Sequence, residues 1–176
     1  MSDATIRLFF ALWPDDATRR ALAACASAVV AQTGGREVAA GNLHLTLAFI
    51  GERPTTLVPT LCHTATLVRV SPMRLVLDEV GCWRKSGIAW LGSRAPDPNV
   101  VALQSRLLDA LATIGIEFQE SRFTPHVTLA RKVASRIALM LAQPLVWESA
   151  SFALVASELA PGGVRYRIIE TWRSDV

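Results

Sequence analysis

Hydrophobic and polar positions follow two periodicities along the chain, and the pattern predicts strands that alternate with helices. Residues 6–13 and 43–50 are short apolar runs typical of buried strands, and residues 73–80 alternate like a half-buried strand. Residues 17–32 form an Ala-rich helical segment that ends at two glycines, and apolar residues recur at helical spacing over 57–68. The first half is therefore predicted to be β-α-β-α-β.

The second half begins with the same order of elements. Its predicted elements are a strand over 88–92, a helix over 99–113, a strand over 123–130, a helix over 134–142, and two long strands over 147–159 and 164–172 joined at Pro161-Gly162-Gly163.

Identical residues at a constant separation of 82 positions link the two halves. The pairs are Pro14 with Pro96, Asp15 with Asp97, His44 with His126, Leu47 with Leu129, and Ala48 with Ala130. One register accounts for all five pairs, although identity elsewhere is low and convergence is the alternative to a fused duplication. We therefore expect one domain over residues 1–176, an α+β fold of two similar, interleaved lobes of sheet and helix that flank a central cleft.

Composition excludes several classes of protein. The chain has 176 residues, of which 51% are hydrophobic and 19% charged, so neither disorder nor a large multidomain assembly is expected. A net charge of +3 permits a phosphate-bearing ligand but lacks the Lys/Arg clusters of a dedicated nucleic-acid binder. The three widely spaced cysteines suggest no disulfide framework, and no segment resembles a signal peptide or a membrane span. We expect a cytoplasmic protein that does not associate with membranes.

Two of the three histidines stand in matching segments, His44-Leu45-Thr46 and His126-Val127-Thr128. On a strand, side chains alternate between faces, so each His shares a face with its Thr while the aliphatic residues pack on the other. Leaving these polar groups buried and unpaired would cost on the order of 1 to 3 kcal/mol each. We therefore expect both polar faces to line one wet cleft.

Two facing imidazoles suit an in-line displacement at phosphorus. With an ordinary pKa of about 6.5, one ring can be neutral and remove a proton from water while the other is charged and protonates the leaving oxygen. The threonine hydroxyls would donate to the phosphoryl oxygens. We expect no metal and no other cofactor. A single His-x-Thr is more often a surface or core pair, and His63, which lacks the Thr, is expected to be an exposed helical residue.

The two motifs and their flanks resemble the 2H phosphoesterase superfamily and, within it, the RNA 2′,3′-cyclic phosphodiesterases, also called 2′-5′ RNA ligases. The segments that carry the resemblance are residues 7–12, 42–51, 123–131 and 166–172. It implies hydrolysis of an RNA or nucleoside 2′,3′-cyclic phosphate to the 2′-phosphomonoester on a bilobal, pseudo-symmetric 2H phosphoesterase-like fold. The positions of the two motifs imply, through this resemblance, that His44 is the proton donor and His126 the proton acceptor, and that Thr46 and Thr128 bind the phosphate. The residues alone leave the order of the histidines open, because a symmetric site has no handedness.

Arg131 is the third phosphate-binding candidate that the resemblance implies. Strict alternation places it opposite His126 and Thr128, so it reaches the site only if the strand twists or bulges after Ala130; a solvated arginine is the alternative. Among the aromatic residues near the motifs, Trp83 is the preferred platform for a stacked base. The other aromatic candidates, more typical of core, are Phe10, Trp13, Phe49 and Phe123.

Two alternatives to this function stay open. The first is another activity of the same site, such as ATP-independent 2′-5′ RNA end ligation or cleavage of a different cyclic phosphate. The second is a non-catalytic module that binds RNA ends or nucleotides. The expected partner is an RNA or oligonucleotide with a 2′,3′-cyclic phosphate end, and we expect a monomer without an obligate protein partner.

Overall fold

The computed structural model describes residues 4–119, 122–161 and 163–174. Its helices are α1 (Asp16–Thr33), α2 (Val58–Thr66) and α3 (Pro98–Ala112), with 3-10 turns at Ala40–Asn42 and Thr55–Leu57. None of these helices is long and apolar enough to cross a membrane. The strands are β1 (Thr5–Leu12), β2 (Arg36–Glu37), β3 (Leu45–Pro54), β4 (Met73–Trp83), β5 (Ile88–Gly92), β6 (His126–Arg131), β7 (Leu139–Ser149), β8 (Ser151–Ala160) and β9 (Gly163–Arg173).

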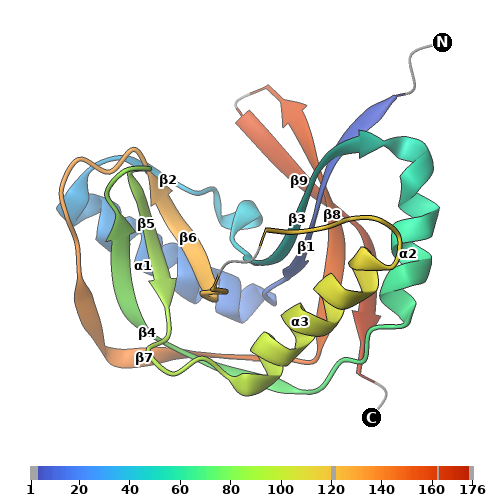
Figure 1. Cartoon of the computed structure of the whole chain (residues 1–176). Coiled ribbons are helices and arrows are strands. Elements are labelled where there is room, and N and C mark those ends of the chain that lie inside the picture. The colour runs from blue at the N-terminus through green and yellow to red at the C-terminus, as the bar shows by residue number, and fades with distance from the viewer. Residues whose placement is uncertain (1–3, 120–121, 162, 175–176) are drawn as a thin grey trace.

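The strands follow the order β7-β4-β5-β6-β3-β1-β8-β9, and β2 pairs with β6. Every pairing between described strands is antiparallel. The register of β3 on β6 contains a single residue pair, Leu45 with Val127, so the sheet narrows to a junction there. Two lobes result, one built from β3-β1-β8-β9 and the other from β7-β4-β5-β6 with β2 (Figure 1). The two motif strands are neighbours at this junction.

Two of the helices pack on the lobe opposite the one that holds the preceding strand. α1 follows β1 of the first lobe but contacts β6 and β7 of the second, whereas α3 follows β5 of the second lobe and contacts β3 of the first. Both helices start at an aspartate that follows the matched prolines: Asp15 accepts from the Thr18 amide and Asp97 from the Asn99 amide, each at 2.7 Å. The prediction of one duplicated domain over residues 1–176 is consistent with this exchange and stays a prediction.

Aliphatic side chains of the motif strands anchor the core. Leu45, Leu47, Val127 and Leu129 are buried beneath the helices, as the alternation predicts. Burying a side chain of this size contributes about 1.5 to 3 kcal/mol, so the strands are held firmly from the face opposite the motif histidines. A smaller apolar cluster, centred on Phe9 and Val155, lies on the other face of β1 and β8.

The prediction of a helix over 134–142 is wrong. Residues 132–138 form no helix, and β7 begins at Leu139 and pairs along β4. The Ala/Leu/Met composition favours a helix locally, but pairing with the sheet overrides propensity. Pro144 is tolerated because β7 is an edge strand and its register is irregular there.

The single strand expected over 147–159 is two strands in different lobes. β7 ends at Ser149 beside β4, and β8 begins at Ser151 beside β1. The crossing at Ala150 lies in a short polar stretch without glycine or proline, so no strong turn signal separates the two strands in the sequence. The β8–β9 hairpin closes by pairing Ala160 with Gly163, and Gly162 of the expected turn lies outside the described residues.

Candidate active site

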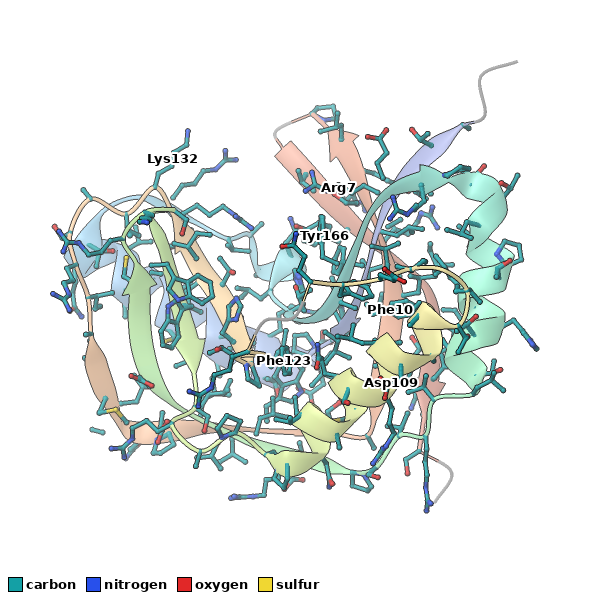
Figure 2. The ribbon with its side chains drawn as sticks, viewed as in Figure 1. Arg7, Phe10, Asp109, Phe123, Lys132 and Tyr166 are labelled. Carbon is teal, nitrogen blue, oxygen red and sulfur yellow. The ribbon has the colours of Figure 1, made fainter. Side chains whose placement is uncertain are left out.

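A cavity of about 600 Å³ lies where the two lobes meet, and we call it the central cavity. Its lining includes all five residues that the sequence singled out as site candidates: His44, Thr46, His126, Thr128 and Arg131. Figure 2 shows Arg7 and Tyr166 of the first lobe facing the opening from one side, with Lys132 of the second lobe across from them. The structure therefore brings both His-x-Thr pairs to one place.

Both imidazoles are held by the same backbone device. The Nδ1 atom of His44 lies 2.7 Å from the carbonyl oxygen of Asn42, and the Nδ1 atom of His126 lies 2.8 Å from that of Thr124. A carbonyl oxygen only accepts, so Nδ1 carries the hydrogen in each ring and Nε2 is the nitrogen left for chemistry. The Nε2 atom of His44 lies 3.0 Å from the hydroxyl oxygen of Thr46.

Aromatic rings fix the planes of the imidazoles. Trp13 stacks on His44 at a centroid distance of 5.6 Å and an interplanar angle of 14°. Phe9 and Tyr166 approach the same imidazole at 4.8 and 5.2 Å, Tyr166 edge-on. Trp83 meets His126 at 4.5 Å with the rings nearly perpendicular. Both imidazoles are thus restrained before any ligand arrives.

This packing changes the protonation of the site. Burial lowers the pKa of His44 from 6.5 to about 4; the Asn42 carbonyl opposes the shift, and the charges of Arg131 and His126 add to it. Burial likewise lowers the pKa of His126, with the Thr124 carbonyl opposing it. Both rings are therefore neutral at pH 7 in the free protein. The expectation of one charged and one neutral ring near neutrality, based on an ordinary pKa, does not hold without a ligand.

A bulge in β6 turns Arg131 toward the central cavity. The pairing of β6 with β5 skips Leu129, so β6 holds one residue more than its partner. Leu129 and Ala130 are consequently both buried, and the next side chain, Arg131, returns to the cavity face. The sequence predicted that Arg131 would reach the site only if the strand twisted or bulged after Ala130. The strand does bulge, at Leu129, one residue earlier than expected.

The same bulge occurs in β3, 82 residues earlier. The pairing of β3 with β1 skips Leu47, and Leu47 and Ala48 are both buried. Phe49, the counterpart of Arg131, is 51% exposed and lines the central cavity. The guanidinium of Arg7 lies 4.8 Å from the centre of its ring. One lobe therefore presents a cation and the other a cation-bound ring at equivalent positions.

Comparison with known proteins places this chain in a family. Residues 13–160 match the model of the 2′-5′ RNA ligase superfamily. The chain belongs to this superfamily. Among curated proteins, the RNA 2′,3′-cyclic phosphodiesterase of Escherichia coli is 36% identical over 169 residues, covering 94% of this chain and 95% of that protein. The RNA 2′,3′-cyclic phosphodiesterase of Thermus thermophilus is 32% identical over 94% of this chain and 88% of that protein.

A solved structure of a similar protein shares the fold. The crystal structure of Escherichia coli LigT complexed with 3′-AMP superposes with a TM-score of 0.89 at 31% identity, covering 98% of this chain and all of LigT. The family predicted from the motifs and the bilobal α+β fold are confirmed. The roles of individual residues stay predictions.

Several residues at the central cavity were not found from the sequence. Phe10 is fully buried, and its neighbour Phe9 faces the site instead. Tyr166, the one tyrosine of the chain, reaches His44 from β9. Arg36 lines the cavity from β2. Only the strand order brings these residues to the motifs, so local periodicity carried no signal for them.

Proposed function

We propose that this chain hydrolyses RNA or nucleoside 2′,3′-cyclic phosphates to 2′-phosphomonoesters with His44 and His126 as the acid–base pair. The observation that carries the proposal is the matched pair of imidazoles: each has its Nδ1 hydrogen bonded to a carbonyl, which leaves Nε2 available in the central cavity. The Escherichia coli and Thermus thermophilus relatives are named RNA 2′,3′-cyclic phosphodiesterases, which supports the reaction class.

In the proposed mechanism, the cyclic phosphate lies between the two Nε2 atoms. Nε2 of His126 removes a proton from water as the water oxygen bonds to phosphorus, and the bond from phosphorus to the 3′ oxygen breaks in line. Nε2 of His44 delivers a proton to the departing 3′ oxygen. Thr46 and Thr128 donate to the non-bridging oxygens, and the Arg131 guanidinium offsets their charge.

Substrate binding favours the protonated form of His44, which the free protein lacks at pH 7. His44 is neutral at pH 7 when free, because burial and the Arg131 charge hold its pKa at about 4. An anionic phosphate next to Nε2 opposes both effects and raises that pKa, since a nearby opposite charge favours the protonated form. His44 then becomes the acid only when substrate is bound.

The test is identification of the product. Purified protein treated with EDTA is incubated with adenosine 2′,3′-cyclic phosphate and with an RNA that ends in a 2′,3′-cyclic phosphate. We expect the 2′-phosphomonoester from both, at a rate that EDTA does not change. The 3′-phosphomonoester as the main product would contradict the leaving-group assignment, and tight binding without any product would identify a non-catalytic module.

A further inference from the structure

The central cavity holds more positive charge than a single cyclic phosphate requires. Its described lining contains the arginines Arg7, Arg36 and Arg131 and a single carboxylate, that of Glu37. A cyclic phosphate diester carries a single negative charge, and Arg131 lies on the strand of His126, where the proposed mechanism uses it on that phosphate. Arg7 lies on β1 of the other lobe, and the reaction at the two histidines makes no use of it.

We propose that Arg7 and Ser157 bind the phosphodiester on the 5′ side of the terminal nucleotide, so that the site favours an RNA end over a nucleoside cyclic phosphate. The inference rests on the proposed function, because it assumes that the cyclic phosphate lies at the two histidines. That phosphate occupies the 2′ and 3′ oxygens of the terminal ribose, and the RNA continues from the 5′ oxygen, across the ribose. The next phosphate is therefore expected on the far side of the nucleoside from the histidines.

Strand β1 places Arg7 just beyond the ring that contacts His44. Phe9 approaches His44 at a ring distance of 4.8 Å, and Arg7 lies on the same face of β1, two residues nearer the N-terminus. At about 3.4 Å per residue, Arg7 lies about 7 Å from Phe9 along the strand. Figure 2 shows Arg7 farther than Tyr166 from the junction of β3 and β6. A nucleoside that extends from His44 along Phe9 brings its 5′ oxygen to Arg7.

Arg7 and Ser157 form a pair of donors on one face of the sheet. They lie directly opposite each other on β1 and β8, and both line the central cavity. Side chains at opposite positions of an antiparallel pair have Cβ atoms about 4.5 to 5.5 Å apart, so one phosphate can contact both. A guanidinium and a hydroxyl both donate to phosphate oxygens, and the guanidinium also supplies a positive charge.

Among the described residues, no acidic side chain neutralises Arg7. No carboxylate of that part of the chain lies within ion-pair distance of its guanidinium, and neither this group nor the Ser157 hydroxyl has a hydrogen-bond partner there. Glu52, which is opposite Arg7 on β3, accepts from the Thr5 hydroxyl at 2.6 Å instead. The guanidinium lies 4.8 Å from the centre of the Phe49 ring, a contact that restrains the cation without giving it an acceptor. Arg7 is therefore positioned and available for an anionic ligand.

The test measures what a phosphate on the 5′ oxygen contributes to turnover. We compare kcat/KM for adenosine 2′,3′-cyclic phosphate with kcat/KM for its 5′-phosphorylated form and for adenylyl-adenosine 2′,3′-cyclic phosphate. We expect the wild-type protein to favour both larger substrates by about 10-fold, mainly through KM, because they gain a charge-assisted hydrogen bond. Because the contact is between charges, this preference should shrink as the salt concentration rises.

Three variants assign the preference to its residues. Arg7→Ala should bring the ratio of kcat/KM values close to one, and Ser157→Ala should lower it by about 3-fold, because it removes a single uncharged donor. Arg53→Ala is the matched control: it removes the same charge from an exposed position on the neighbouring strand β3, outside the central cavity. This variant should keep the wild-type ratio.

The outcomes that would overturn the subsite differ from the one that would overturn the proposed function. A wild-type ratio near one would overturn the subsite, and an equal loss for all three substrates in Arg7→Ala would do so by placing Arg7 on the terminal nucleoside. A preference for the dinucleotide without one for the 5′-phosphorylated mononucleotide would also overturn it, because the second nucleoside would then be the group recognised. Turnover of none of the three substrates by the wild-type protein would instead overturn the proposed function.

Discussion

The tautomer and the burial of each candidate histidine are set by one backbone carbonyl and by the aromatic rings packed against it. The carbonyls two residues earlier fix the Nδ1 hydrogen, and burial against Trp13 and Trp83 removes water from the rings. The sequence predicted these two residues because the same His-x-Thr pair occurs twice in one register. It could not predict their lowered pKa values, which depend on burial by residues from other strands.

The lowered pKa values predict an acidic optimum for the free protein. The reaction needs one charged and one neutral imidazole, and both pKa values lie below 6.5, that of His44 at about 4. We expect a bell-shaped profile of kcat/KM with its maximum below pH 6.5: the acid loses its proton at higher pH, and the base gains one at lower pH. The kcat profile should lie at higher pH, because bound phosphate raises the pKa of the acid. Initial rates across this range test it, and a kcat/KM maximum above neutral pH would contradict it.

Arg131 should act on both the phosphate and His44. Arg131→Ala removes a charge-assisted hydrogen bond, so we expect kcat/KM to fall by about 10- to 100-fold. The same change removes a positive charge that lowers the pKa of His44, so that pKa should rise in the free protein. Steady-state rates and NMR titration of the histidines measure the two effects. Arg136→Ala, at an exposed arginine outside the central cavity, should change neither.

At the level of secondary-structure elements, turn and cap signals in the sequence predicted where α1 and α3 begin. The features that depend on pairing between strands were not predicted. Pro14-Asp15 and Pro96-Asp97 correctly marked the starts of α1 and α3. The segment 134–142 was misassigned because its helical propensity is outweighed by pairing along β4. The bulges at Leu47 and Leu129 were also beyond reach, since a bulge depends on the partner strand and not on local alternation.

The cap of α1 gives a stability prediction. Asp15 accepts from the Thr18 amide at 2.7 Å, so Asp15→Ala should lower the free energy of unfolding by about 1 kcal/mol. Asp16→Ala is the matched control: its carboxylate is exposed and makes a surface ion pair with Arg19, and a loss under about 0.5 kcal/mol is expected. Urea unfolding measures both. Equal effects of the two substitutions would mean that Asp15 does not cap the helix.

For the molecule as a whole, the repeat offset of 82 indicated two lobes but not their interleaving. The matched pairs located the lobes' equivalent strands, and the exchange of α1 and α3 between lobes emerged only in the structure (Figure 1). The exchange makes the site depend on the whole fold, because each motif strand is buried under a helix from the other half of the chain.

Burial of His44 in its neutral form couples the stability of the fold to the protonation of the site. Below pH 6.5 the unfolded chain binds a proton at His44 that the folded chain does not, so the free energy of unfolding should fall as pH drops from 6.5 toward 4. The contribution of this residue is at most about 3 kcal/mol. Urea unfolding of wild type and His44→Gln at the two ends of this range isolates it. The same pH dependence in both proteins would show that His44 is not buried in its neutral form.

The most direct test of the two-histidine mechanism is single-turnover hydrolysis of adenosine 2′,3′-cyclic phosphate by His44→Gln and His126→Gln. Circular dichroism and the unfolding midpoint establish that each variant is folded at the pH of the assay. Because each imidazole is assigned a proton transfer, we predict that each substitution lowers the rate by about 100-fold or more, and that the double variant is little worse than either single one. A folded variant that keeps its rate within about tenfold of wild type would contradict the two-histidine mechanism.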